Sequence, residues 1–136
     1  MTLKEALMRD EGLRLKPYVD TVGKWAVGFG RNLTDSGISL AEAELLLDND
    51  IQRATAGVLA ALPWTTGLDE VRRGALENMA FNLGVTGLLG FHKMLAALQR
   101  GDWPTAALEA LNSEWARQVG PRAYRLSRQL ETGAWT

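Results

Sequence analysis

The sequence predicts an α+β fold: a small lobe with a short antiparallel β-ribbon, joined by a long helix to a mainly α-helical lobe. Between Pro17 and Leu33, apolar residues alternate with polar or small ones, which is the period of a strand. Elsewhere apolar residues recur every three or four positions, which is the period of a helix. One helical pattern runs unbroken over residues 39–62, and a helix of that length spans roughly 30 Å, enough to connect two lobes.

The first expected element is a short helix over residues 2–11. Thr2-x-x-Glu5 has the pattern of a capping box, and Gly12 is a typical residue at which a helix stops. Glu11 is therefore expected on the last turn of this helix, where the chain leaves regular structure.

Two strands are expected next, over residues 18–21 and 25–29, and they form the only sheet predicted. Because side chains alternate along a strand, Tyr18 and Asp20 share one face of the ribbon. By the same rule Ala26 lies on the opposite face of its strand from the aromatic residues beside it.

A second capping box, Ser39-x-x-Glu42, begins the long helix, and Pro63 ends it near Leu62. Shorter helices are expected after it, at about residues 68–83, 91–99, 103–112, 114–119 and 121–131. The chain is expected to form a single domain over residues 1–136, with the small lobe at about 12–50 and the helical lobe at about 63–136 together with the N-terminal helix, 2–11.

Composition limits the chemistry that this chain can perform. It has no cysteine and one histidine, His92. Disulfides, thiol nucleophiles, cysteine-ligated metals and multi-histidine metal sites are therefore excluded. A Ser-His triad would have to use His92. The 16 Asp and Glu side chains are the main acid/base groups that are left.

The formal net charge of −1 does not support nucleic-acid binding by the whole molecule. Four arginines near the end of the sequence would suit either a solvated helix face or an anion-binding surface: Arg117, Arg122, Arg125 and Arg128. No apolar stretch reaches the length of a membrane span, and the amphipathic N-terminus is unlike a signal peptide. We therefore expect a protein that stays in the cytoplasm where it is made.

Glu11 and Asp20 are the candidate catalytic pair. A helix end folded back against a ribbon can bring the two carboxyl groups across a cleft from one another. Cleavage of a glycosidic bond needs one protonated carboxyl to donate to the leaving oxygen and one ionised carboxylate to activate water or stabilise positive charge. By spacing alone, these acids would equally suit a solvated surface.

The residues around this pair resemble the active-site region of bacteriophage lysozymes, glycoside hydrolase family 24. The matching stretches are Asp10-Glu11-Gly12-Leu13-Arg14-Leu15-Lys16, Tyr18-x-Asp20-Thr21-x-Gly23 and Gly28-x-Gly30. The similarity resumes at Leu68-Asp69-x-Val71-Arg72-Arg73 and continues to Thr132-Gly133-x-Trp135, which is nearly the whole chain. Between Leu33 and Ile38, longer relatives carry extra residues in the small lobe.

The resemblance implies hydrolysis of the β-1,4 bond between N-acetylmuramic acid and N-acetylglucosamine in peptidoglycan, with inversion. Glu11 matches the family's general acid, and Asp20 matches the carboxylate that works with the attacking water. Inversion requires the two carboxyl groups to stand roughly 6.5–9.5 Å apart. Arg122 matches an arginine beside the acid, whose charge would tend to keep Glu11 ionised.

Ala26 departs from the family pattern, in which the third active-site position is a threonine. The threonine hydroxyl is understood to hold the nucleophilic water together with the aspartate, and alanine has no donor or acceptor for this. Loss of one positioning group can cost on the order of a hundredfold in rate. Activity could therefore be much reduced, through an engineered inactivation or a natural variant with a rearranged water site.

Arg31 is a second departure, at a position where relatives often carry a histidine paired with an acid. Asp50 lies at the matching place, so we predict an Arg31–Asp50 ion pair between the ribbon and the long helix. For the glycan cleft the resemblance points to further residues: Tyr18, Asn32, Phe81, Asn82, Met94 and Glu109. Core packing is an equal alternative for Phe81.

The resemblance implies no metal and no cofactor. The expected partner is the peptidoglycan glycan strand, with no nucleic acid and no membrane, and the protein is expected to be a monomer. It would accumulate in the cytoplasm of the host bacterium and reach the periplasmic cell wall only after a separate holin-type membrane protein opens the inner membrane.

Two functions of other classes stay open. One is a catalytically impaired variant that binds peptidoglycan and scarcely cuts it. The other is a lytic transglycosylase, which needs one acid and no water. A helical nucleic-acid binder is a distant third, because the overall charge is near neutral and the arginines are dispersed.

Overall fold

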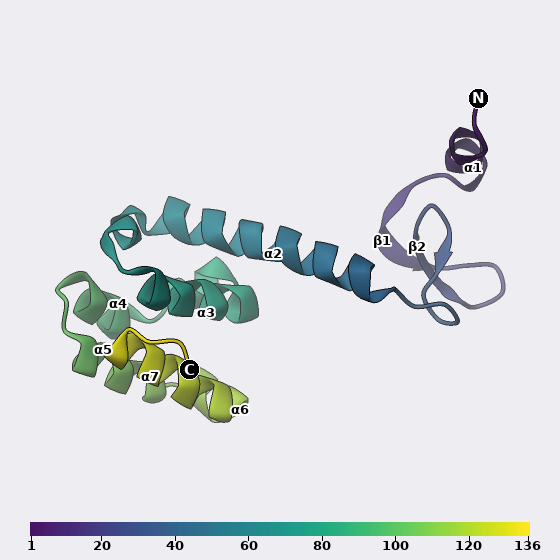
Figure 1. The fold of residues 1–136 in the computed structure, drawn as a ribbon. Coiled ribbons are helices and arrows are strands. Elements are labelled where there is room, and N and C mark those ends of the chain that lie inside the picture. The colour runs from purple at the N-terminus through teal and green to yellow at the C-terminus, as the bar shows by residue number, and fades with distance from the viewer. The chain divides into compact units, whose positions relative to one another are not determined.

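The computed structural model describes residues 1–136 and has the predicted α+β architecture: an N-terminal helix, an antiparallel sheet, a long helix and a set of shorter helices (Figure 1). The chain divides into two compact units, which we call the N-terminal unit (Met1–Leu46) and the C-terminal unit (Leu47–Thr136). The predicted grouping of the N-terminal helix with the helical lobe stays a prediction.

Helix α1 (Leu3–Glu11) opens the N-terminal unit, and its predicted capping box is confirmed. The Thr2 hydroxyl accepts a hydrogen bond of 3.1 Å from the Glu5 N–H, and the Glu5 carboxylate accepts one of 2.6 Å from the Thr2 N–H. The helix ends at Gly12, whose φ of 72° is costly for residues with a side chain. Glu11 is consequently the last residue of α1.

Three antiparallel strands follow, in the order β1 (Arg14–Val19), β2 (Trp25–Gly28) and β3 (Arg31–Asn32). β2 lies within the predicted strand, whereas β1 starts at Arg14 instead of Tyr18. The register of β1 against β2 shifts between Arg14 and Tyr18, so the alternation of side chains does not reveal the first residues of β1. β3 was not predicted, because two residues are too few to show a period.

Helix α2 (Leu40–Ala61) confirms the predicted long helix and has 22 residues. Both halves of its capping box form: the Glu42 N–H donates to the Ser39 hydroxyl at 3.1 Å, and the Ser39 N–H donates to the Glu42 carboxylate at 2.9 Å. A 3₁₀ turn at Pro63–Gly67 separates α2 from the next helix.

The remaining helices match the predicted series closely. They are α3 (Glu70–Leu89), α4 (His92–Gln99), α5 (Trp103–Leu111), α6 (Glu114–Val119) and α7 (Pro121–Thr132). The helix predicted at about residues 68–83 ends just before Gly84. Gly84 does interrupt the helix with a non-helical φ of 77°, but helical structure resumes after it.

Almost all of the buried apolar side chains belong to the C-terminal unit. α3, α4 and α7 contribute the largest of them: Leu76, Met79, Leu88, Met94, Leu98 and Leu130. In the N-terminal unit only Ala26 is buried, at 3% exposure. The hydrophobic core is therefore helical, and the sheet has almost no core of its own.

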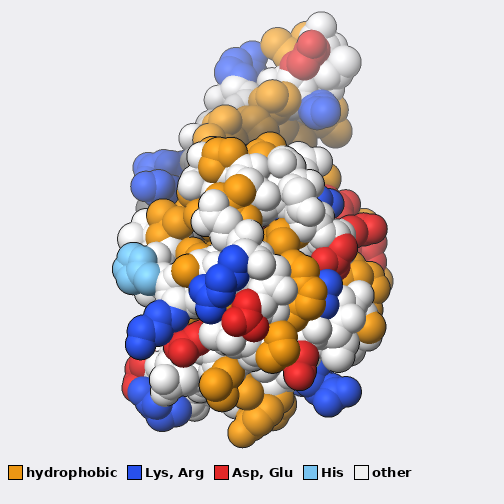
Figure 2. Space-filling model, turned by 90° about the vertical axis from the view of Figure 1, so that its left-hand side faces the viewer, with side chains coloured by type: hydrophobic (Ala, Val, Ile, Leu, Met, Phe, Trp, Pro, Cys, Tyr) orange, Lys and Arg blue, Asp and Glu red, His pale blue; other side chains and the backbone are white.

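No single helix is long and apolar enough to span a membrane. Helices α3 and α4 meet these two criteria only when they are taken together, and they are bent by 100° relative to each other. On the face in Figure 2, Lys and Arg side chains are interspersed with Asp and Glu. This mixing favours the interpretation of the charged residues as a solvated surface. The one histidine, His92, is exposed there.

Candidate active site

Glu11 lies against the turn between β2 and β3. A Cβ atom built on Gly30 would stand 3.0 Å from Oε2 of Glu11 and 3.5 Å from its carboxyl carbon. A Cβ atom there would make an unusually tight contact, so the Glu11 carboxyl would have to shift by a few tenths of an ångström, and the φ of 76° at Gly30 favours a glycine as well. The sequence had placed Gly30 only within a motif of the resembling family, without its contact with the candidate acid.

Asp20 closes the turn between β1 and β2. Its Oδ1 accepts hydrogen bonds from the Val22 N–H at 3.0 Å and the Lys24 N–H at 2.8 Å. The Asp20 N–H donates to the Lys24 carbonyl at 2.8 Å, so both main chain and side chain are held. Within the N-terminal unit, Oδ2 has no hydrogen-bond partner and is free to act on a ligand.

The two candidate carboxylates are therefore associated with opposite ends of β2. Asp20 lies at the turn that precedes Trp25, and Glu11 lies at the turn that follows Gly28. β2 has four residues, so at a rise of about 3.3 Å per residue its ends are about 10 Å apart. An inverting pair requires roughly 6.5–9.5 Å between its carboxyl groups, which is close to the length of this strand.

Tyr18, Ala26 and Asn32 form a row across the sheet. Tyr18 pairs with Ala26 on the neighbouring strand, and Ala26 pairs with Asn32. Directly opposed residues project from the same face, and Asp20, two positions after Tyr18, belongs to that face too. The sequence placed Tyr18 and Asp20 together, and the register adds Ala26 and Asn32 to them.

Arg31 makes its ion pair with Glu42 in its own unit, and the Arg31–Asp50 pair stays a prediction. Its guanidinium donates to the Glu42 carboxylate at 2.7 Å and to the Gly37 carbonyl at 3.1 Å, while Asp50 pairs with Arg53 one turn along α2. Glu42 stands on the first turn of α2, which the chain reaches soon after β3. The hydrogen bonds from Arg31 and then from Ser39 lower the pKa of Glu42 to about 2.

In the C-terminal unit, Arg122 on α7 is held by Asn78 on α3. Its Nε and one terminal nitrogen both donate to Oδ1 of Asn78, at 3.0 and 2.7 Å. Arg122, Asn78 and Phe81 line a pocket of about 330 Å³ together with apolar residues of α2. Phe81 is 45% exposed, so the structure favours a surface role for it over core packing.

Asn82 is engaged by the core. The indole N–H of Trp115, which is 4% exposed, donates to Oδ1 of Asn82 at 2.8 Å. The amide is thereby oriented, with its N–H groups left for a ligand. The ring of Trp115 also packs edge-on against Phe91, with centroids 5.9 Å apart.

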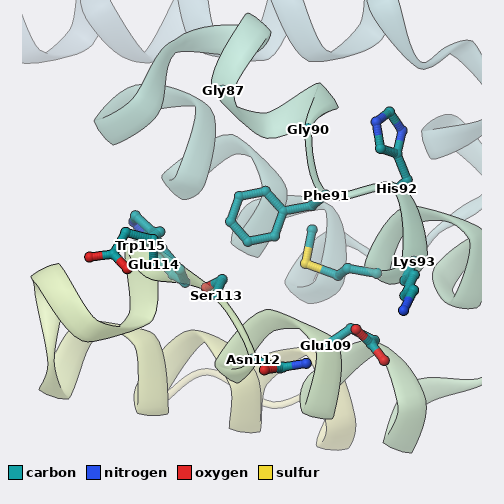
Figure 3. A pocket seen from close by; sticks show the side chains of 11 residues that line it. Gly87, Gly90, Phe91, His92, Lys93, Glu109, Asn112, Ser113, Glu114 and Trp115 are labelled. Atoms are coloured by element: carbon teal, nitrogen blue, oxygen red, sulfur yellow. The ribbon is translucent and has the colours of Figure 1, made fainter.

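Met94 and Glu109 line a second pocket, of about 490 Å³, between α4, α5 and α6 (Figure 3). Met94 is 1% exposed and belongs to the core, which leaves it little surface to offer a sugar. Glu109 is half-buried and, like Lys93 across the pocket, forms no ion pair within 4 Å. In Figure 3 the Phe91 ring points into this pocket and His92 points away from it.

Comparison with known proteins adds relatives to this geometry. The pre-baseplate central spike protein of Enterobacteria phage T4 is 34% identical over 161 aligned positions, covering 98% of this chain but only 28% of that protein. Probable T4-type lysozyme 1 of Dictyostelium discoideum is 30% identical, covering 97% of this chain and 95% of its own length. An endolysin of Acyrthosiphon pisum secondary endosymbiont phage 1 is 32% identical, covering 85% of this chain and 80% of its own length.

The aligned stretch of 161 positions exceeds the 136 residues of this chain, so the relatives carry residues that it lacks. The sequence had predicted such a shortening in the small lobe. The phage lysozyme family itself matches residues 8–131, which include Glu11, Asp20 and the helices of the C-terminal unit except the last residue of α7. This chain therefore belongs to the phage lysozyme family.

Proposed function

We propose that the chain hydrolyses the β-1,4 bond between N-acetylmuramic acid and N-acetylglucosamine in peptidoglycan, with inversion at the anomeric carbon. The observation that supports it is the placement of Glu11 and Asp20 at the two ends of β2. Glu11 donates its proton to the glycosidic oxygen as the bond to C1 breaks. Asp20 takes a proton, through its free Oδ2, from the water that attacks C1 on the opposite face.

The remaining residues have supporting roles in this proposal. Tyr18 and Asn32 bind the glycan from the sheet, while Phe81 and Asn82 offer a flat apolar ring beside an oriented amide. Glu109 contacts the glycan from the edge of the pocket that it lines. Arg122, whose role beside the acid stays a prediction, is held by two hydrogen bonds to Asn78. Arg31 and Glu42 fix the turn after β3 to α2.

Ala26 lowers the rate in this proposal without abolishing glycan binding. A threonine hydroxyl at this place could help to hold the attacking water, and a methyl group cannot. We expect the loss to be on the order of a hundredfold in kcat. The second candidate function, a peptidoglycan-binding variant that scarcely cuts, rests on this same substitution.

The test compares the release of reducing ends from purified peptidoglycan by the chain and its variants. We expect slow cleavage by the parent chain, faster cleavage by Ala26→Thr, and none by Glu11→Gln or Asp20→Asn. Asp10→Asn is the matched control, since Asp10 is a neighbouring acid that pairs with Arg9. It should leave the rate unchanged.

Each of the other outcomes favours a different function or removes one of the proposed roles. Equal rates for the parent and Ala26→Thr would remove the role given to position 26. A silent Asp20→Asn variant with anhydro-muramic products would identify a lytic transglycosylase. Retention on insoluble peptidoglycan without cleavage by either chain would leave the binding variant.

The proposal also covers where the protein works. One relative bears the name endolysin, which supports action on the cell wall. We further propose that the chain acts from the host cytoplasm after a separate holin-type protein opens the inner membrane. We propose that it acts as a monomer. Cells that express the chain should lyse only when the membrane is permeabilised, and sedimentation should give the mass of one chain.

A further inference from the structure

The peptide group between Lys24 and Trp25 is hydrogen-bonded at both of its ends. Its carbonyl, which belongs to Lys24, accepts the Asp20 N–H at 2.8 Å, and its N–H, which belongs to Trp25, donates to the Thr34 hydroxyl at 2.9 Å. A trans peptide is a rigid plane from which the carbonyl and the N–H point in opposite directions. This one plane therefore connects Thr34, in the turn after β3, to the backbone of Asp20, in the turn before β2.

The Thr34 hydroxyl takes the place of a strand carbonyl. The register of β2 against β3 would place Leu33 opposite Trp25 as the next pair, and such a pair normally exchanges two hydrogen bonds. The Leu33 N–H does donate to the Trp25 carbonyl at 2.7 Å, but the Leu33 carbonyl accepts the Gly37 N–H at 3.1 Å as the chain turns away. Thr34 thus completes the pairing with a side-chain oxygen, and without it the Trp25 N–H would have no acceptor in the protein.

Lys24 holds Asp20 through its main chain at two points. Its N–H donates to Oδ1 of Asp20 at 2.8 Å, and its carbonyl accepts the Asp20 N–H at 2.8 Å. A second link from the turn after β3 reaches the Lys24 side chain, whose Nζ lies 3.2 Å from Oδ1 of Asp35. Both of these charged groups are exposed, so solvent screens their attraction and the bond to the Thr34 hydroxyl is the main link.

We propose that Thr34 is a positioning residue for Asp20 and acts through the peptide group between Lys24 and Trp25. This inference rests on the proposed function, in which Asp20 takes a proton from the attacking water. Hydrogen bonds in a chain polarise one another, so the bond at the N–H of this peptide strengthens the bond that its carbonyl accepts from Asp20. With the turn fixed and Oδ1 engaged, Oδ2 keeps one orientation. Thr34 itself gains and loses no proton.

The test removes the Thr34 hydroxyl and measures kcat and KM separately on solubilised glycan strands, in the parent chain and in Ala26→Thr. Thr34→Val keeps the size and branching of the side chain, and it should lower kcat by roughly three- to tenfold with KM nearly unchanged. Thr34→Ser keeps the hydroxyl and should stay within about twofold of the parent. Thr66→Val is the matched control, since the Thr66 hydroxyl donates to the Pro63 carbonyl at 3.0 Å in the other unit, and it should change neither constant.

Amide hydrogen exchange follows the same link without a substrate. In Thr34→Val the Trp25 N–H loses its acceptor and should exchange faster, and the Lys24 N–H, which is bound to Asp20, should exchange faster as well. Thr34→Ser should keep both amides protected. Thr34 is exposed, so its replacement leaves no cavity in a core, and Thr34→Ala carries the same test if Thr34→Val fails to fold.

Four results would overturn the inference. They are an unchanged kcat in Thr34→Val, an equal loss in Thr34→Val and Thr34→Ser, a rise in KM alone, and faster exchange at Trp25 that leaves Lys24 and kcat unaffected. The last of these would show that Thr34 completes the strand pairing and does nothing for Asp20. Each of them spares the proposed function as long as the parent or Ala26→Thr cleaves the glycan, whereas a lack of cleavage by every chain would reject the proposed function and this inference together.

Discussion

Gly30 shows how one residue without a side chain can shape a catalytic site. The Glu11 carboxyl lies so close that a Cβ atom on Gly30 would stand 3.0 Å from Oε2 and would push the carboxyl aside by a few tenths of an ångström. The backbone there has a φ of 76°, which other residues rarely adopt. Gly30 is thus constrained twice, by conformation and by the candidate acid.

Gly30→Ala should therefore harm both stability and activity. We expect a loss of about 1–2 kcal/mol in unfolding free energy from the backbone alone. Displacement of the Glu11 carboxyl should lower kcat by on the order of ten- to a hundredfold. Chemical denaturation and reducing-end assays measure the two effects.

Gly37→Ala separates these two effects, because Gly37 has a similar φ of 60° and nothing within 4 Å of its would-be Cβ. The control should lose stability and keep its rate. If both variants keep full activity, the contact between Gly30 and Glu11 has no part in catalysis.

At the scale of elements, the start of α2 joins a helix cap to the sheet. Glu42 accepts the Ser39 N–H as part of the capping box and also accepts a hydrogen bond from the guanidinium of Arg31 on β3. The sequence contained the first role in the pattern Ser39-x-x-Glu42. The ion pair with Arg31 depends on where β3 ends relative to α2.

The acid side of the stability profile should depend on Glu42. Its pKa is about 2 in the folded protein, below the ordinary 4.5, because of Arg31 and then Ser39. A carboxyl with a lowered folded pKa stabilises the protein above its unfolded pKa, and this contribution fades as pH falls from about 5 toward 2. The melting temperature of the parent should exceed that of Glu42→Gln near pH 6, and the difference should shrink toward pH 2.

Glu44→Gln is the control on the same helix, since Glu44 makes no ion pair. Its difference from the parent should show no such dependence on pH. A constant gap between parent and Glu42→Gln across the acid range would contradict the role of this ion pair and cap.

For the whole molecule, core and candidate carboxylates lie in different units. The C-terminal unit holds nearly every buried apolar side chain, whereas the N-terminal unit holds Glu11, Asp20 and a single buried alanine. Regions with few buried apolar contacts open more readily than the rest of a protein. We therefore expect the sheet to exchange its amide hydrogens through openings smaller than global unfolding.

Leu76→Ala tests this division. Leu76 is fully buried in α3, so its truncation should cost about 2–5 kcal/mol in the C-terminal unit. Amide exchange should accelerate accordingly in α3, α4, α5 and α7, and much less in β2. Leu108→Ala, at a 65% exposed position of α5, should change neither. Equal acceleration in β2 would show that the two units open as one.

The sequence by itself determined the helices and the central strand, and it located Glu11 and Asp20 at a helix end and a turn. The helices and the turn at Asp20 depend on hydrogen bonds between residues two to four positions apart, such as the Thr2 cap and the bonds from Val22 and Lys24 to Asp20. Only the tertiary structure decided that Arg31 meets Glu42, that Asn32 lies beside Ala26 and that Asn82 is held by Trp115. These contacts depend on strand register and helix packing, in which several partners of suitable chemistry compete for one place.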